Sequence, residues 1–343
     1  MDSRPAEGPP QTDATDPQTP TVLRMDLLPP PGTAVTSTDE NRPRWGLAIA
    51  LFVATVATAT TVSPAWYLAT RTDRIAPFEA VMSPALAHWT WTSPEIWKLG
   101  LKVALPALFI LLCHELGHYI ACRRYAIRAT LPYFIPAPFG FGSLGAFIRI
   151  QSALRNRREL FDVGFAGPAA GFVALIPWLL YGMAHSTPVV IANLAPGGGS
   201  ELLVPGRSLA MQLAAWPFHG WLGSNVVLDL HPFALGAWIG LFATALNLIP
   251  LSQLDGGHIF YAAAGRWQHK LAWPLWGVLA LLAFLWPGWG VWCVLLLWMR
   301  VKHPPVFDEN EPLDARRKAW ALVALALLVL CFMPVPLDSL RLP

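Results

Sequence analysis

Charged residues are scarce in this sequence. Asp, Glu, Lys and Arg make up 13% of its 343 residues, whereas soluble domains usually contain about 25%. Hydrophobic residues reach 55%, and the mean hydropathy is +0.45. This composition excludes an ordinary water-soluble enzyme and predicts an integral membrane protein that contacts the lipid bilayer. The net charge is only +3, and basic residues flank apolar runs, so the sequence predicts no nucleic-acid partner.

Cysteine is also rare, and its placement argues against two kinds of site. The four cysteines lie singly inside apolar segments, and none forms a C-x-x-C pair. The spacing therefore argues against a disulfide framework and against a structural cysteine-zinc site. We expect these residues to pack against other apolar side chains; they are Cys113, Cys122, Cys293 and Cys331.

Long apolar runs without charge dominate the sequence. A bilayer core of about 30 Å requires about 20 apolar residues in a helix, and the runs approach or exceed that length. They are residues 45–70, 163–183, 232–254, 271–299 and 319–337. A sixth run, residues 103–122, is the only one with charge in its middle. The runs predict an all-α polytopic membrane protein.

The basic residues predict which side of the membrane each loop faces. Residues 1–43 are rich in Pro, Thr and Asp, which predicts a disordered tail. The positive-inside rule places this tail in the cytoplasm, and residues 71–98 and 185–231 outside. This predicted orientation rests on the arginines that follow residues 103–122, namely Arg123, Arg124, Arg128, Arg149, Arg155, Arg157 and Arg158.

The number of spans depends on residues 271–299. A single span there would place the basic residues around Arg316 outside, against the charge rule. The sequence W-P-G-W at residues 286–289 is a strong turn signal that would fold this run into two short segments. The prediction is therefore six or seven transmembrane segments. The third run opens with a stripe of small residues that predicts close helix packing, formed by Gly164, Gly167 and Gly171.

The sixth run contains the H-E-x-x-H pattern at His114, Glu115 and His118. Residues four apart share one face of a helix, so both imidazoles can bind one zinc ion at about 2.0 to 2.1 Å, with Glu115 close to a water on that metal. In soluble helices such a pattern is usually a solvated, salt-bridging face. Inside an apolar run, ionisable groups are costly and require partners or a function. A transporter or channel that uses these side chains as a proton or cation path is the alternative.

A catalytic zinc site needs a third protein ligand and an open position. Asp255 is the candidate, because it stands at the cytoplasmic end of residues 232–254. His118 lies about 7 Å inside the same boundary by helix rise, so the two side chains can meet. Pro250 weakens the helix, and the glycines after Asp255 permit a sharp turn. Taken alone, Asp255 is better explained as a helix-terminal carboxylate at the lipid interface.

Together the two segments resemble the site-2 protease family of intramembrane zinc metalloproteases. The family signatures are H-E-x-x-H on one span and N-x-x-P-x-x-x-L-D-G on a later one, and both occur here without a mismatch. The resemblance covers about residues 99–260. Family members can carry PDZ or CBS domains, and no segment here predicts one. The second signature falls on Asn247, Pro250, Leu254, Asp255 and Gly256.

The resemblance implies a zinc metalloendopeptidase that binds one Zn2+ per chain and cleaves transmembrane proteins in regulated proteolysis. The family pattern assigns zinc binding to His114, His118 and Asp255. It assigns the general base to Glu115, and a hydrogen bond near the reacting carbonyl to Asn247. An inactive scaffold is a further alternative, which the intact Glu115 argues against. A membrane-anchored zincin is another, but such enzymes usually draw a third ligand from a soluble helix.

Residues 134–150, between the second and third spans, combine aromatic, β-branched and glycine residues. They predict a small membrane-associated β-hairpin whose free edge pairs with an extended substrate peptide. Gly140, Phe141 and Gly142 are the expected substrate-binding residues, because glycine permits close approach of another backbone. An ordinary glycine-bearing loop explains the same residues, and only the family resemblance favours the hairpin. Other polar candidates are expected to be structural: Trp91, Ser143 and His258.

The chain divides into four predicted regions. They are a disordered cytoplasmic tail at residues 1–43, a first span and outer loop at 44–98, a catalytic membrane core at 99–260, and C-terminal membrane segments at 261–343. The expected location is a bacterial inner membrane, with an organelle membrane as the alternative, and the N-terminus and the active-site end are expected in the cytoplasm.

Overall fold

The described structure begins after the N-terminal tail. A computed structural model describes residues 44–70, 88, 91–193, 201–306, 308 and 311–341. All of them belong to one compact unit, residues 43–343. The disorder expected for residues 1–43 and most of the outer loop at 71–98 lies outside the described residues.

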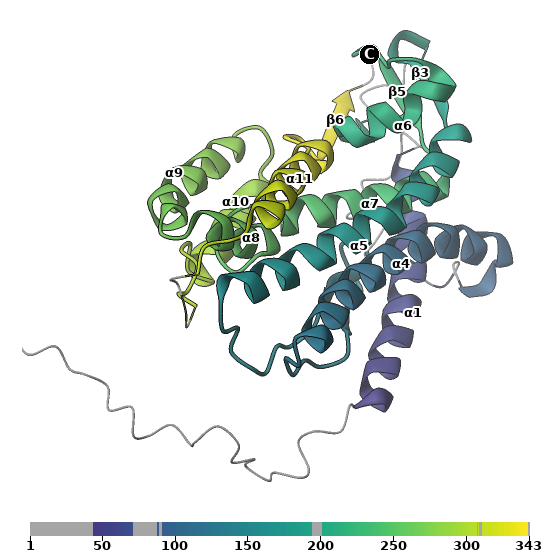
Figure 1. The fold of residues 1–343 in the computed structure, drawn as a ribbon. Coiled ribbons are helices and arrows are strands. Elements are labelled where there is room, and N and C mark those ends of the chain that lie inside the picture. The colour runs from purple at the N-terminus through teal and green to yellow at the C-terminus, as the bar shows by residue number, and fades with distance from the viewer. Residues whose placement is uncertain are drawn as a thin grey trace, which may run out of the picture. The chain divides into compact units, whose positions relative to one another are not determined.

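Three helices are long and apolar enough to cross a membrane, judged by length and composition (Figure 1). They are α1 (Trp45–Ala69), α4 (Pro94–Arg124) and α5 (Arg157–Ala184). Their 25 to 31 residues correspond to about 37 to 46 Å at the helix rise, which exceeds a bilayer core of about 30 Å. The chain is thus an integral membrane protein, as the composition predicts.

Six shorter helices occur in the described residues, together with the 3-10 turn η2 (Ile191–Asn193). They are α6 (Leu209–His219), α7 (Pro232–Asn247), α8 (Asp255–Ala264), α9 (Trp267–Leu282), α10 (Gly288–Trp298) and α11 (Ala315–Cys331).

The expected continuous span at residues 232–254 is wrong, because α7 ends at Asn247 and no helix resumes until Asp255. Pro250 cannot donate the backbone hydrogen bond that a helix requires. Ser252 adopts a left-handed conformation with a φ of 55°. The break places the Asn and the Asp of the second signature at two separate helix ends.

The predicted turn at residues 286–289 is present, since α9 ends at Leu282 and α10 begins at Gly288. Trp276 on α9 donates its indole N–H to the carbonyl oxygen of Cys293 on α10, at 3.1 Å. The two helices therefore fold back on one another. With 16 and 11 residues, they are about 24 and 16 Å long by helix rise. The count of six or seven spans stays a prediction.

Short strands form three separate pairs in the described residues. β1 (Tyr133–Pro136) and β2 (Ser143–Phe147) form the antiparallel hairpin predicted between the second and third spans. The other two pairs correct the all-α expectation. The sequence does not predict them, because the two strands of each pair are distant in the chain and no local pattern indicates the pairing. They are β3 (Thr187–Val190) with β5 (Val226–Asp229), and β4 (Glu201–Pro205) with β6 (Leu337–Arg341).

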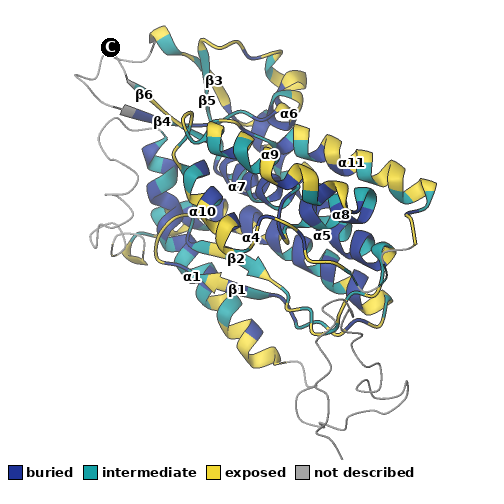
Figure 2. Cartoon of the chain, turned by 90° about the vertical axis from the view of Figure 1, so that its left-hand side faces the viewer, coloured by how far each residue is buried: buried dark blue, intermediate teal, exposed yellow. Residues whose placement is uncertain are grey.

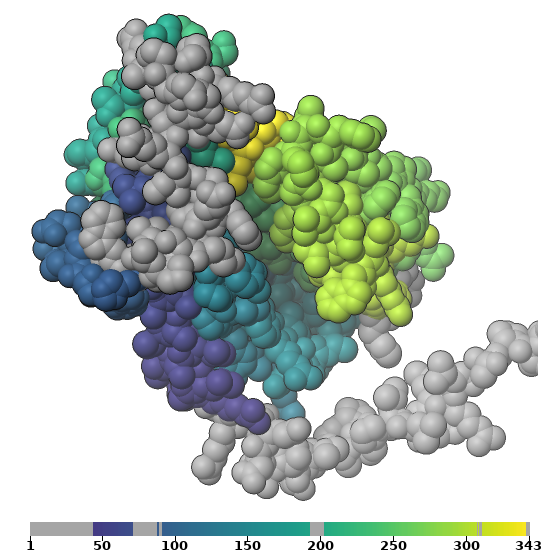
Figure 3. Space-filling model, turned by 180° about the vertical axis from the view of Figure 1, so that it is seen from behind, coloured from purple at the N-terminus to yellow at the C-terminus, as the bar shows by residue number. Residues whose placement is uncertain are grey.

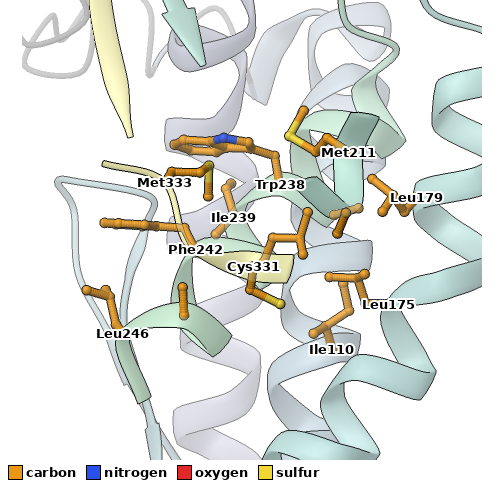
Figure 4. Packing of buried hydrophobic residues seen from close by; sticks show 14 of the residues in the cluster. Ile110, Leu175, Leu179, Met211, Trp238, Ile239, Phe242, Leu246, Cys331 and Met333 are labelled. Carbon is orange, nitrogen blue, oxygen red and sulfur yellow. The ribbon is translucent and has the colours of Figure 1, made fainter. Parts of the chain in front are cut away.

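Helices α4, α5 and α7 contain many of the buried residues of the described structure (Figure 2). Trp238 and Phe242 on α7 stack with ring centroids 5.9 Å apart, in a cluster that includes Leu175 on α5 (Figure 4). A Cβ added to Gly236 on α7 would lie 2.3 Å from the carbonyl oxygen of Val103 on α4. Glycine therefore lets α7 and α4 approach closely. This close packing holds α7 in position against α4.

The outer surfaces of α9 and α10 are apolar. Phe284, between the two helices, is 88% exposed, and Trp298 at the end of α10 is 83% exposed. These helices form the light-green part of the surface in Figure 3. Large exposed apolar side chains of this kind fit a lipid-facing surface.

Candidate metal and catalytic centre

The H-E-x-x-H pattern lies within α4, on the part of the helix that faces α5. Helix geometry places His114 and His118 on one face, and their rings make an edge contact with centroids 4.8 Å apart. His114, Glu115 and His118 are only 3, 6 and 7% exposed. The protein thus shields three ionisable side chains from lipid and from water, and this arrangement favours a functional role.

Asp255 meets both histidines. It is the first residue of α8, and its Oδ2 lies 3.0 Å from His114 Nε2 and 3.3 Å from His118 Nε2. The two Nε2 atoms are 3.0 Å apart. The structure therefore brings together the three predicted metal ligands, although His114 and Asp255 are 141 positions apart in the sequence.

Three donor atoms at these separations fit one metal ion. Zinc bonds of about 2.0 to 2.1 Å in a tetrahedral site place the ligand atoms about 3.3 Å from one another. Two imidazole nitrogens and one carboxylate oxygen form a common ligand set for catalytic zinc, with the fourth position left for water or substrate. His114, His118 and Asp255 can therefore hold zinc without a large rearrangement.

The main chain of α5 orients one of the two rings. His118 Nδ1 lies 2.7 Å from the carbonyl oxygen of Val163. A carbonyl can only accept a hydrogen bond, so Nδ1–H is the donor and Nε2 is left for a metal. This contact sets both the tautomer and the ring plane of His118.

The glycine stripe on α5 makes room for the histidines. A Cβ added to Gly167 would lie 2.1 Å from His118 Nε2, and one added to Gly171 would lie 3.1 Å from His114 Cβ. The stripe was expected to serve helix packing alone, and that expectation was too narrow. Its helical spacing, which matches that of the two histidines, is the sequence signal that could have linked the two helices.

Glu115 and Asn247, the predicted catalytic residues, both border the metal ligands. Asn247 is the last residue of α7, and its Nδ2 lies 3.4 Å from His114 Nε2. The Glu115 carboxylate lies near the backbone N–H of Ile148, which directly follows β2. Sequence reasoning missed Ile148, because a backbone donor leaves no side-chain signal.

The predicted substrate-binding residues contact α1. Trp66 donates its indole N–H to the carbonyl oxygen of Gly140, and Thr58 Oγ1 donates to that of Gly142 at 2.7 Å. The Phe141 ring lies 4.8 Å from the Trp66 ring, between centroids. Gly142 also permits a close backbone approach by α1, since a Cβ there would lie 2.2 Å from Ala59 Cα. Binding of substrate by these three residues stays a prediction.

The residues expected to be structural form hydrogen bonds with other parts of the protein. His258 Nδ1 and His303 Nε2 lie 2.7 Å apart, and burial lowers the pKa of both to about 4, so both rings are neutral at pH 7. Ser143 Oγ accepts a hydrogen bond from the Gly145 N–H within the hairpin. Trp91 donates to Thr61 at 2.9 Å.

The fold and the site define a membrane-embedded protein with a His-His-Asp site whose two histidines lie on a spanning helix. The model for peptidase family M50 matches residues 103–274, which make up half of the chain. The matched region contains both sequence signatures. The chain belongs to this family of peptidases, the site-2 protease family.

Several plant proteins are similar to the chain. Probable zinc metalloprotease EGY2, chloroplastic, from Oryza sativa subsp. indica is 31% identical over 299 residues, which cover 82% of this chain and 53% of that protein. Its Arabidopsis thaliana namesake is 29% identical over 297 residues, with 81% and 50% covered. Probable zinc metalloprotease EGY1, chloroplastic, from Arabidopsis thaliana is 31% identical over 240 residues, with 69% and 43% covered. The chain spans about half the length of these relatives.

Proposed function

We propose that this protein is an intramembrane zinc metalloprotease that hydrolyses peptide bonds in or near transmembrane segments of other membrane proteins. The observation that carries the proposal is the meeting of His114, His118 and Asp255, with donor atoms 3.0 to 3.3 Å apart, beside a buried Glu115. The relatives named as zinc metalloproteases favour this activity over a proton or cation transporter.

Each polar residue of the site has a role in the proposed reaction. His114, His118 and Asp255 hold the zinc ion, which when bound supplies Lewis acidity that activates water and polarises a carbonyl. Glu115 accepts the proton of the attacking water and returns it to the departing amine. The Asn247 amide, next to His114, donates a hydrogen bond to the developing oxyanion; such donors commonly contribute about 10² to 10³ in rate.

A transmembrane substrate must be unwound before its peptide bonds can react, because helical amides are hydrogen-bonded internally. The β1–β2 hairpin supports this step. β2 leads directly to Ile148, whose backbone contacts Glu115, so a peptide paired with the edge of β2 would run towards the site. Gly140, Phe141 and Gly142, in the turn between β1 and β2, are proposed to contact this peptide, and their contacts with α1 hold the hairpin in place.

The proposed orientation follows from the basic residues. The arginines at the end of α4 and the start of α5 support a cytoplasmic position for the site end and for residues 1–43. We propose a bacterial inner membrane as the location and regulated proteolysis as the process. The chloroplastic location in the relatives' names is that of those proteins. Fusions of alkaline phosphatase and of a fluorescent protein to residue 44 would test the orientation.

The proposed activity can be measured in lipid vesicles. The purified chain, reconstituted with a single-span substrate that carries a fluorescent tag on each side of the membrane, is expected to cut within or next to the span. Addition of o-phenanthroline should abolish cleavage, because it removes zinc, and added Zn2+ should restore it. Proton or cation flux in the same vesicles without any cleavage would contradict the proposal and support a transporter.

A further inference from the structure

The zinc ligand His118 depends on α5 for its orientation. Its Nδ1–H donates to the carbonyl oxygen of Val163 at 2.7 Å, and Val163 is only 2% exposed. Partners of this kind hold a metal-bound imidazole in the plane and tautomer that the metal requires. A shift of α5 along α4 would therefore be transmitted to the ligand through the Val163 carbonyl.

The residue before Val163 is held by a side chain from the C-terminal part of the protein. Asp162 accepts two hydrogen bonds from the Arg317 guanidinium, from Nε at 2.8 Å and from Nη2 at 2.6 Å. Two parallel bonds from one guanidinium fix direction as well as distance. The Arg317 and Asp162 side chains are 25% and 29% exposed, so water and salt screen this pair less than a surface ion pair.

The same guanidinium also reaches α4. Tyr125 follows the last residue of α4; its hydroxyl donates to Asp162, and it lies 3.3 Å from Arg317 Nη2. Arg317 thus joins the end of the helix that carries His118 to the start of the helix that orients it.

Arg317 is itself fixed at the start of α11. The Asp314 side chain caps this helix by accepting from the Arg317 N–H at 2.8 Å, and it also accepts from Arg317 Nη1. Hydrogen bonds from Arg317 lower the pKa of Asp314, which keeps that carboxylate charged at neutral pH. Hydrogen bonds thus hold both the backbone N–H and the guanidinium of Arg317, so this side chain can act as a rigid link between helices.

We propose that Arg317 is a positioning residue for the zinc site: by holding Asp162 and Tyr125 it sets the register of α5 against α4, and with it the Val163 carbonyl that orients His118. The proposal rests on the proposed zinc chemistry. It extends the site beyond both sequence signatures, because Arg317 lies outside the matched residues 103–274.

The test compares metal binding in variants of the full-length protein in detergent. Arg317→Gln should raise the zinc dissociation constant, measured by competition with a chromophoric chelator, by about tenfold or more, as changes to outer partners of metal ligands do. The absorption bands of the Co2+-substituted protein should shift at the same time, because the ligand geometry changes. The matched control is Arg316→Gln, at an exposed neighbour on the same helix, which should leave both readouts at wild-type values.

Arg317→Lys is the second variant, and it covers the case in which Arg317→Gln does not fold. Lysine keeps the charge but not the two parallel bonds, so zinc affinity should fall by less than in Arg317→Gln, with a smaller spectral shift. Wild-type affinity and spectrum in both variants would overturn the proposal even if thermal stability fell, because Arg317 would then be structural only. A wild-type chain that binds neither Zn2+ nor Co2+ would instead overturn the proposed function, and this proposal with it.

Discussion

Replacement of Glu115 by Gln is expected to lower kcat for cleavage of a transmembrane substrate by a factor of about 10² to 10⁴, which is the usual contribution of a general base. Glutamine has nearly the same size and keeps its carbonyl oxygen for the contact with the Ile148 backbone. It cannot accept the proton of the attacking water. Because Glu115 is not one of the three metal ligands, the variant should still bind one zinc ion per chain.

The control for this variant is a buried glutamate elsewhere. Glu159, near the start of α5, accepts a hydrogen bond from the Arg155 N–H at 2.9 Å, and Glu159→Gln can keep that bond. Glu159→Gln should therefore cleave substrate at close to the wild-type rate. Undiminished cleavage by Glu115→Gln, with zinc bound, would contradict the role of Glu115 as the base.

Gly167→Ala is expected to disrupt the site from the opposite helix. The new Cβ would lie 2.1 Å from His118 Nε2, the nitrogen that faces the metal, so the ring or α5 must move by more than 1 Å to restore ordinary contact. Misplacement by about 1 Å can reduce rates about 10²-fold. We expect a loss of that order in kcat/KM, together with weaker zinc binding in the chelator competition.

Two controls separate this effect from general instability. A Cβ on Gly182, on the same helix, would lie 2.5 Å from the Ala234 backbone nitrogen, far along α5 from the histidines. Gly182→Ala should lower thermal stability with a smaller change in zinc affinity. Gly277→Ala on α9, with nothing within 4 Å of the new Cβ, should change neither. Wild-type zinc binding and cleavage in Gly167→Ala would show that His118 does not lie against α5.

The sequence was most informative where chemistry is local. The charge pattern identified the three long helices, because lipid excludes charged side chains from spans. The spacing of His114 and His118 predicted one shared face, and the structure places both rings there. The prediction that Asp255 meets the histidines came from the second signature and from the estimated depth of His118 in the membrane. The distances of 3.0 and 3.3 Å from Asp255 to the two histidines confirm that the side chains meet.

Features that depend on partners distant in the sequence could not be predicted in the same way. The glycine stripe indicates which face of α5 packs closely but not what packs against it, so Gly167 was interpreted as a packing residue. The pairing of Arg317 with Asp162 joins positions 155 apart, and each looks like an ordinary charge beside a span. The end of α7 at Asn247 was missed because apolar residues continue past it, although Pro250 already marks the break.

Metal content of purified protein, measured by inductively coupled plasma mass spectrometry on wild type and Asp255→Asn, tests the account most directly. Asparagine has the shape of aspartate but lacks its negative charge, and a neutral amide is a poor zinc ligand. We predict about one zinc per chain in the wild type, after washing with a weak chelator, and little zinc in a folded Asp255→Asn variant. A folded wild type without zinc, or an Asp255→Asn variant that retains it fully, would contradict the proposed site.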